Sequence, residues 1–359
     1  MSSPIHTLDE NMRTADVDTN GIRWHRIDEA PFRVSGLAWY DTEKRFRRMP
    51  LTPSPGIPSA VRSLSDCTSG AQLQFHTESA RVAVRVALAA PAGMDHMPST
   101  GQCGLDCYIG EVGSMRFAGV TRIPYGASNY EVPVLTASAR ERRRITLNFP
   151  LYQGVKSIAI GIEDGTRIEA PKAYTVDGRI IVYGTSITQG GCAARPGMCY
   201  TNILSRRIDA EFINLGFSGN GRGEREVADV IAQIERPRLF VLDYEANCVS
   251  AELYRTTLPA FIGTLRAKHP ATPILVISRI RYAHENISPT RDRDERLVFQ
   301  RTLVEELRTH GDANIHFLDG SPLLGDDFDE CTVDGVHPTD LGFLRMADGI
   351  EPSLRRILA

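Results

Sequence analysis

Residues 180–188 read Ile-Ile-Val-Tyr-Gly-Thr-Ser-Ile-Thr, a short apolar run followed by glycine and then by three hydroxyl residues within four positions. An apolar run of this length before a glycine indicates a buried strand that ends in a turn. Ser186 would then lie just beyond the carboxyl end of the strand, ahead of a helix. A single serine there more often caps the following helix than attacks a substrate, so its role depends on the rest of the chain.

The pattern of 180–183 recurs four times in the second half of the chain, in alternation with helix-length segments. The further apolar runs are 212–215, 239–242, 274–277 and 315–318, and the helical segments fall near 198–209, 223–235, 251–269, 292–310 and 340–358. This alternation predicts an α/β fold, a three-layer α/β/α domain around a five-stranded parallel sheet. Ligands of such sheets bind beyond the carboxyl ends of the strands, which is where Ser186 falls.

The first half has a period of two, which is typical of half-buried strands. Residues 72–76 and 82–86 alternate on either side of the turn 77–79, and this predicts a β-hairpin. Similar runs occur at 107–109, 115–117, 145–149 and 157–162. Many short strands between Gly, Pro and Asp clusters predict a jelly-roll-like β-sandwich, and the proline-rich segment 50–58 predicts an irregular crossing loop.

The length of 359 residues exceeds what one hydrophobic core usually holds, so we expect two domains. The change of period places an N-terminal tail at residues 1–20, a β-sandwich domain at 21–175 and an α/β domain at 176–359. The net charge of -3 gives no reason to expect nucleic acid or an anionic membrane as a partner. Since the chain shows neither a membrane-length apolar stretch nor the features of a signal peptide, we expect a cytoplasmic protein.

Three patterns that can mark a metal or nucleotide site are incomplete in this sequence. Cys103 and Cys107 lack a second pair at ligand spacing, so the seven cysteines are expected to be reduced thiols. The acidic run 326–330 lacks the spacing of a calcium loop. The Gly-x-Gly-x-x-Glu that starts at Gly219 has Glu224 where a dinucleotide fingerprint needs glycine. We therefore expect no metal and no organic cofactor.

The loops after the other strands carry polar groups that complement Ser186. The second strand ends in a glycine-rich turn around Gly219, whose backbone N–H groups can approach a ligand. Asn247 follows the third strand and can donate an amide N–H to a developing oxyanion. Asp334 and His337 lie three apart in a Gly/Pro loop, so that Asp334 can orient the imidazole as a base. Each residue has a structural explanation on its own, but together they supply all the parts of a serine hydrolase.

On these residues, 178–359 resembles the SGNH (GDSL-type) hydrolase family. Gly-Thr-Ser-Ile corresponds to its first block, with Thr185 in place of the usual Asp, and implies that Ser186 is the nucleophile. The second block is matched at Gly219 and the third at Asn247, which implies that both form the oxyanion hole with the Ser186 N–H. The fifth block, Asp-x-x-His-Pro, is complete at 334–338 and implies Asp334 and His337 as the other catalytic residues.

Other positions depart from the family pattern or extend it. Glu245 and Cys248 replace the Gly and Asp of the third block, which changes the shape and charge of the expected acyl pocket. In the first half, 104–108 read Gly-Leu-Asp-Cys-Tyr, similar to the Gly-x-Asp-Leu-Tyr motif of a β-rich domain that precedes some SGNH hydrolases. The order of the two motifs agrees with the change of period.

The resemblance implies hydrolysis of a small-molecule ester through an acyl-serine. The chain has no long apolar lid-like segment, so we expect short, acetyl-type esters of a carbohydrate or another polar metabolite. Arg195 and Glu245 are candidates for substrate contact, although a solvated arginine and an ion-paired glutamate are the simpler explanations. Two alternatives remain open: a non-catalytic carbohydrate-binding protein, and a lipase or thioesterase for longer acyl chains. The sequence does not define the oligomeric state and is compatible with a homo-oligomer.

Overall fold

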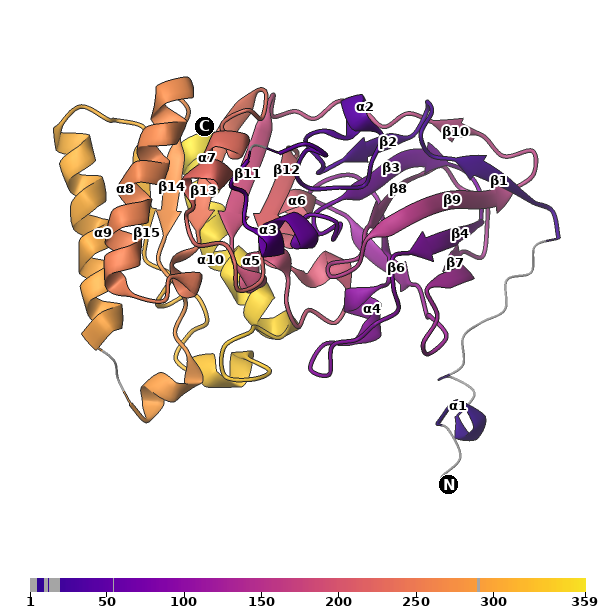
Figure 1. Cartoon of the computed structure of the whole chain (residues 1–359). Helices are drawn as coiled ribbons and strands as arrows, with labels where there is room; N and C mark the ends of the chain where they lie inside the picture. Colours follow the sequence, from indigo (N-terminus) through magenta and orange to yellow (C-terminus); the bar gives the residue numbers. More distant parts are fainter. Residues whose placement is uncertain (1–4, 10–11, 13–19, 54, 289–290) are drawn as a thin grey trace.

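The computed structural model describes residues 5–9, 12, 20–53, 55–288 and 291–359. Most of the predicted tail, residues 1–20, therefore lies outside the described residues, apart from pieces such as the short helix α1 (Ile5–Leu8). Figure 1 shows a β-rich half, drawn mainly in indigo to magenta, beside a half with long helices in orange to yellow.

The β-rich half consists of two antiparallel sheets around one apolar core. The four-stranded sheet has the order β1 (Ile22–Arg26), β9 (Val155–Glu163), β4 (Arg81–Leu88) and β7 (Asn129–Thr136). The six-stranded sheet has the order β10 (Ile168–Glu169), β3 (Gln72–Thr77), β8 (Arg143–Asn148), β5 (Asp106–Ile109) and β6 (Arg116–Val120), with β2 (Arg33–Ser35) on β3. The connections hold the short helices α2 (Tyr40–Glu43), α3 (Ser59–Leu64) and α4 (Ser99–Gln102). The predicted β-sandwich is confirmed.

The predicted hairpin of residues 72–86 is wrong, although both of its strands exist. β3 pairs with β2, β8 and β10, whereas β4 pairs with β7 and β9 in the other sheet. Glu163 at the end of β9 holds the turn between them: its carboxylate accepts from Ala80 N at 2.7 Å, and its N–H donates to Ser79 Oγ at 3.0 Å. These bonds direct the chain into the opposite sheet, and alternation alone does not specify the partner of a strand.

The second half is a parallel sheet with helices on both faces, as predicted. The strand order is β12 (Glu211–Gly216), β11 (Arg179–Gly184), β13 (Pro237–Asp243), β14 (Ile274–Ile277) and β15 (Ile315–Leu318). The helices are α5 (Ser186–Gln189), α6 (Tyr200–Arg207), α7 (Arg225–Ile231), α8 (Ala251–Lys268), α9 (Arg291–Thr309) and α10 (Asp340–Leu358). None of the helices within the described ranges combines the length and the hydropathy needed to cross a membrane.

Alternate residues of each strand face opposite helix layers, which gives the three-layer arrangement. In β11, Ile181 and Tyr183 belong to a core cluster with residues of α7 and α8. Ile180 and Val182 belong to another cluster, with residues of α6 and α10. Helices cover both faces of the sheet, and all five carboxyl ends lie along one edge, which is where ligands of such sheets usually bind.

A buried arginine joins the two halves. Arg48, between α2 and α3, is fully buried, and its guanidinium donates to the carbonyl oxygens of Cys67 (2.8 Å) and Leu64 (2.7 Å). It also donates to the carbonyl of Gly216 at the end of β12 and lies 4.8 Å from the centre of the Phe217 ring. Burial lowers the pKa of Arg48 to about 10, so the side chain remains charged at neutral pH. A residue of the first half thus satisfies backbone groups next to the edge of the parallel sheet.

Substitution of Arg48 by Met is expected to lower the free energy of unfolding by on the order of 3 kcal/mol, because several buried carbonyl groups lose their donor. Arg255→Met on α8, where the side chain is 48% exposed, is the matched control and should change the stability little. Denaturant unfolding of both variants measures the difference. A loss of less than about 1 kcal/mol in Arg48→Met would contradict the proposed contribution of this residue.

Candidate active site

Ser186 lies at the sharp turn between β11 and α5. A Cβ at Gly184 would overlap the Thr188 side chain and lie 2.6 Å from the carbonyl oxygen of Asp243, so the turn requires glycine. Thr185, not Ser186, is the N-cap of α5, since its Oγ1 accepts from Ile187 N at 3.2 Å. The alternative of Ser186 as a helix cap is therefore wrong, and its hydroxyl is available for another partner.

That partner is His337, which lies 151 positions later in the chain. Ser186 Oγ is 2.8 Å from His337 Nε2, and His337 Nδ1 is 2.7 Å from Asp334 Oδ2. The other oxygen of Asp334 accepts from the backbone N–H groups of His337 (2.8 Å) and Val336 (3.0 Å), which fixes the carboxylate in the loop before α10. With Nδ1 donating to the carboxylate, Nε2 is left to accept the serine proton.

The charge of Asp334 is held by its own loop. Partial burial of the carboxyl raises its pKa, but the two backbone N–H donors and the His337 imidazole more than offset this effect. The pKa of Asp334 lies below its ordinary value as a result. An ionised carboxylate in this position stabilises an imidazolium, as a base that has taken a serine proton requires.

The loops after β12 and β13 lie next to each other. Asn247 Nδ2 donates to the carbonyl oxygen of Phe217 at 3.1 Å, which leaves its second amide hydrogen free for another acceptor. Gly219 has a φ of +66° and is exposed, and no atom lies within 4 Å of the position that a Cβ would take. The same turn is tied to α5, because Ser218 N donates to Gln189 Oε1 at 3.0 Å. The structure thus links the predicted oxyanion donors to the element that carries Ser186.

Arg195 lies at the contact between the two halves, and its donors face the first half. Its Nη1 donates to Asp106 Oδ2 at 2.8 Å and to Tyr108 Oη at 2.6 Å, and its guanidinium lies over the Phe117 ring at 3.9 Å. Asp106 is fully buried and also accepts from Gly197 N at 2.8 Å. Asp106 and Tyr108 belong to the Gly-Leu-Asp-Cys-Tyr segment. We infer from these contacts that Arg195, which was a candidate for substrate contact, positions the loop after α5.

The structure does not bring Glu245 to the surface of the site either. Its side chain is 1% exposed, and its Oε2 accepts from Arg279 N and from Gln300 Nε2, both at 2.8 Å. Burial raises the pKa of Glu245, and the two hydrogen bonds counteract this shift in part. Glu245 braces the short 3₁₀ helix η3 (Glu245–Asn247) that carries Asn247, so its burial favours a structural role over the substrate contact for which it was a candidate.

A buried polar network next to α5, the helix that carries Ser186, was not predicted from the sequence. Asp243, the last residue of β13, accepts from Tyr200 Oη at 2.8 Å and from Thr188 Oγ1 at 3.1 Å. Burial raises the pKa of Asp243 to about 7, and the hydrogen bonds from Tyr200 and Thr188 limit the shift. An ionisable residue at the carboxyl end of a central strand could have marked Asp243 as part of the site. Its partners Tyr200 and Thr188 could not be identified, because no local pattern in the sequence links them to Asp243.

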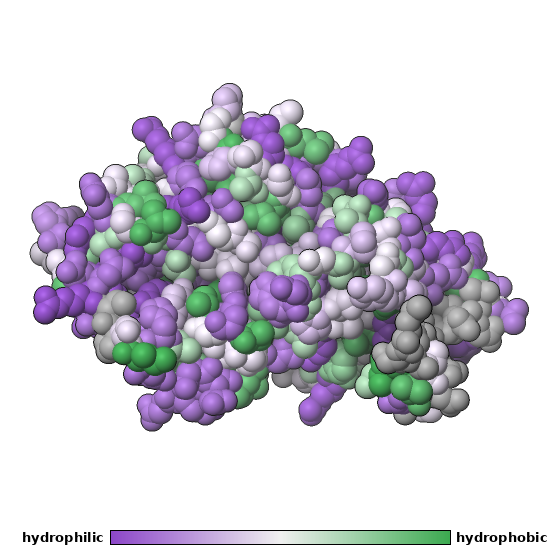
Figure 2. Space-filling model, turned by 60° about the horizontal axis from the view of Figure 1, so that its bottom comes forward, coloured by the Kyte–Doolittle hydropathy of each residue, from purple (hydrophilic) through white to green (hydrophobic). Residues whose placement is uncertain are grey.

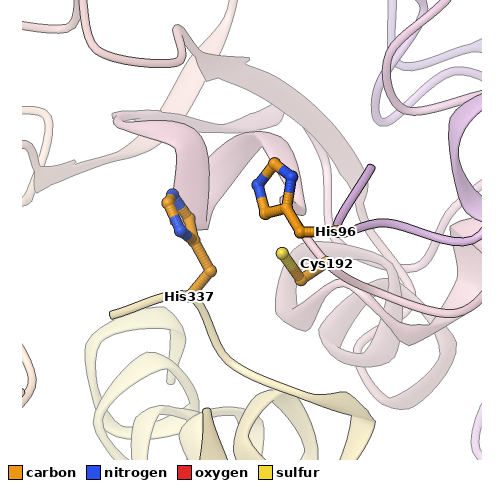
Figure 3. Close-up of side chains that lie close together, drawn as sticks. All are labelled: His96, Cys192 and His337. Atoms are coloured by element: carbon orange, nitrogen blue, oxygen red, sulfur yellow. The ribbon is translucent and has the colours of Figure 1, made fainter. Parts of the chain in front are cut away.

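Two further side chains approach His337 from other segments. His96 comes from the loop between β4 and α4 of the first half, and its ring centre lies 5.9 Å from that of His337. Cys192 follows α5 and is buried. Figure 3 shows the three side chains grouped together, although each comes from a different part of the chain. No local pattern in the sequence marks this group.

Comparison with known proteins relates both halves to one group of enzymes. A sequence profile described as the GDSL-like lipase/acylhydrolase family matches residues 177–355, and a profile for the N-terminus of SGNH-hydrolase-type esterases matches residues 22–168. A solved GDSL-like lipase from Bacteroides ovatus is 34% identical, with a TM-score of 0.85, and the match covers 94% of this chain and 98% of that one. None of the curated proteins matches the chain at a significant level.

More distant structures share the fold. A salicylyl-acyltransferase from a tetracycline biosynthetic pathway is 20% identical with a TM-score of 0.75, and the match covers 94% of this chain and 98% of that one. A family two carbohydrate esterase from Cellvibrio japonicus is 16% identical with a TM-score of 0.60, over the same fractions of the two chains. Both matches extend across the β-rich half as well as the α/β half.

The raised pKa of Asp243 predicts a pH-dependent stability. Between about pH 4 and pH 7 the folded protein holds a proton at Asp243 that the unfolded chain releases, so this contribution to stability falls as the pH rises. The asparagine side chain in Asp243→Asn carries no charge at any pH, so the variant avoids this decrease in stability. The thermal midpoint of the variant minus that of wild type should therefore increase from pH 5 to pH 8. The matched control is Asp229→Asn, at an exposed position of α7, for which this difference should not change with pH. A difference that falls with pH would contradict this assignment.

Proposed function

Because this chain belongs to the GDSL-like lipase/acylhydrolase (SGNH) family and is a carboxylic ester hydrolase, we propose that it acts through a covalent acyl-Ser186 intermediate. The observation that carries the proposal is the continuous chain of hydrogen bonds from Ser186 Oγ through His337 to Asp334. This chain provides a nucleophile, a base and a group that orients the base.

The reaction has two halves. Ser186 Oγ attacks the ester carbonyl carbon while His337 Nε2 takes the hydroxyl proton, and the imidazolium then passes that proton to the leaving alcohol. Water then attacks the acyl-serine with His337 again as base. The carboxylic acid is released, and the imidazolium returns the proton to Ser186 Oγ, which regenerates the free serine. In both steps the N–H groups of Ser186 and Gly219 and the free amide hydrogen of Asn247 stabilise the oxyanion.

Ser186→Ala and His337→Ala should each lower kcat/KM for p-nitrophenyl acetate by roughly four to six orders of magnitude, because the nucleophile and base act as a unit. Ser114→Ala, in the exposed turn between β5 and β6, is the matched serine control and should retain the wild-type rate. Steady-state kinetics of the purified proteins checks this. Ser186→Ala protein that retains more than about a tenth of the wild-type rate would rule out Ser186 as the nucleophile.

We further propose that the substrate is a short-chain, acetyl-type ester of a carbohydrate or a similar polar metabolite. Figure 2 turns the side of the molecule that carries α5 toward the viewer, and hydrophobic residues form small separate patches there among hydrophilic ones. Such a surface suits a polar substrate better than a long acyl chain, which needs a continuous apolar area. The similarity in fold to a family two carbohydrate esterase agrees with this choice.

Acyl preference separates this substrate class from the lipase or thioesterase alternative. The kcat/KM for p-nitrophenyl acetate should exceed that for p-nitrophenyl octanoate, and acetylated oligosaccharides should release acetate in an assay for free acetic acid. A clear preference for octanoate would contradict the substrate proposal while leaving the role of Ser186 intact.

A further inference from the structure

Three side chains beside the nucleophile form a possible set of metal ligands. One ligand atom each of His96, Cys192 and His337 lies within 4.8 Å of the other two. The set combines two imidazoles with one sulfur, which is the donor chemistry that Zn²⁺ prefers over Mg²⁺ or Ca²⁺. The three residues come from the first half, from the loop after α5 and from the loop before α10 (Figure 3).

Both imidazoles are oriented in the way that zinc ligands usually are. His96 Nδ1 lies 3.1 Å from Asp95 Oδ1, and His337 Nδ1 lies 2.7 Å from Asp334 Oδ2. Histidines that bind zinc generally donate one ring N–H to a carboxylate and bind the metal through the other nitrogen. In both residues the carboxylate occupies Nδ1, so that Nε2 is the ligand atom.

Cys192 is held in place by an unusual backbone. It is buried and has a φ of +72°, in the left-handed region that residues other than glycine rarely adopt. A left-handed backbone at such a residue persists only where the surrounding structure enforces it. This conformation places the thiol next to the catalytic histidine.

We propose that Zn²⁺ binds reversibly to His96 Nε2, Cys192 Sγ and His337 Nε2, with water as the fourth ligand, and that it inhibits the esterase. Zinc–nitrogen and zinc–sulfur bonds of about 2.1 and 2.3 Å put tetrahedral ligand atoms roughly 3.5 Å apart. The ligand atoms must therefore draw together by up to about 1.3 Å, and the exposed His96 on its loop is the group that can move.

Inhibition follows from the ligand that the metal shares with the proposed catalytic apparatus. Binding replaces the hydrogen bond between His337 Nε2 and Ser186 Oγ by a metal–nitrogen bond, and the Cys192 thiol releases its proton to solvent. His337 then has no lone pair to accept the serine proton. The inhibitory effect rests on the proposed function, whereas the binding of the metal does not.

His96→Ala tests the site without altering Ser186, His337 or Asp334. After treatment with EDTA and its removal, the variant should hydrolyse p-nitrophenyl acetate within about twofold of wild type. Half-inhibition of wild type by ZnCl₂ should need at least about tenfold less metal than half-inhibition of His96→Ala, and EDTA should restore both activities. His310→Ala, an exposed histidine after α9, is the matched control and should respond to Zn²⁺ as wild type does.

Two readouts of metal binding do not depend on activity. Calorimetric titration with ZnCl₂ should show tighter binding to wild type than to His96→Ala, and Co²⁺ should give a thiolate-to-metal absorption band that is lost in Cys192→Ser. Equal inhibition of wild type and His96→Ala, or the absence of the cobalt band in wild type, would overturn the proposed site. Metal binding by a protein without esterase activity would support the metal site and contradict the proposed function.

Discussion

All five strands of the second half run parallel, so every loop that leaves a carboxyl end lies along the same edge of the sheet. This constraint brings together residues that are far apart in the chain. The loops after β11, β12 and β13 carry Ser186, Gly219 and Asn247, and the segment after β15 returns His337 to Ser186 at 2.8 Å. Glycine at position 184 makes the first of these turns tight enough to present the serine.

The β-rich half supports this edge through buried polar contacts. Arg48 donates to a backbone carbonyl at the end of β12, and Asp106 binds both Arg195 and the N–H of Gly197 beyond α5. Buried charges are costly unless they are paired or hydrogen-bonded. Arg48 is hydrogen-bonded to carbonyl groups and Asp106 forms an ion pair, in both cases across the boundary between the halves. The conformation of the loop that carries Ser186 therefore depends on both halves, and the first half also places His96 beside His337.

Features that depend on local pattern could be predicted from the sequence. The five strands of the parallel sheet and the helices between them follow from apolar runs and amphipathic spacing. The hydrogen-bonded set of Ser186, Asp334 and His337 follows from short motifs in strand order. The partners of a strand are not local, which is why β3 and β4 were wrongly paired across the turn that Glu163 captures.

Side-chain roles that depend on distant partners could not be predicted. Arg195 was a candidate for substrate contact, but it is bound by Asp106, which lies 89 positions earlier in the chain. Glu245 is buried and accepts a hydrogen bond from Gln300 of α9, which lies 55 positions later. For the same reason the sequence did not group His96 and Cys192 with His337, because three separate loops must fold before these side chains meet.

We infer that Ser186 carries the acyl group while Gly219 and Asn247 bind the oxyanion. A crystal structure of the protein after reaction with a methyl fluorophosphonate would reveal both features, since the tetrahedral phosphorus mimics the tetrahedral intermediate of acyl transfer. We expect a bond from phosphorus to Ser186 Oγ, with the phosphoryl oxygen about 3 Å from the N–H groups of Ser186 and Gly219 and from Asn247 Nδ2. Phosphorus on another residue, or a phosphoryl oxygen turned away from Gly219 and Asn247, would contradict it.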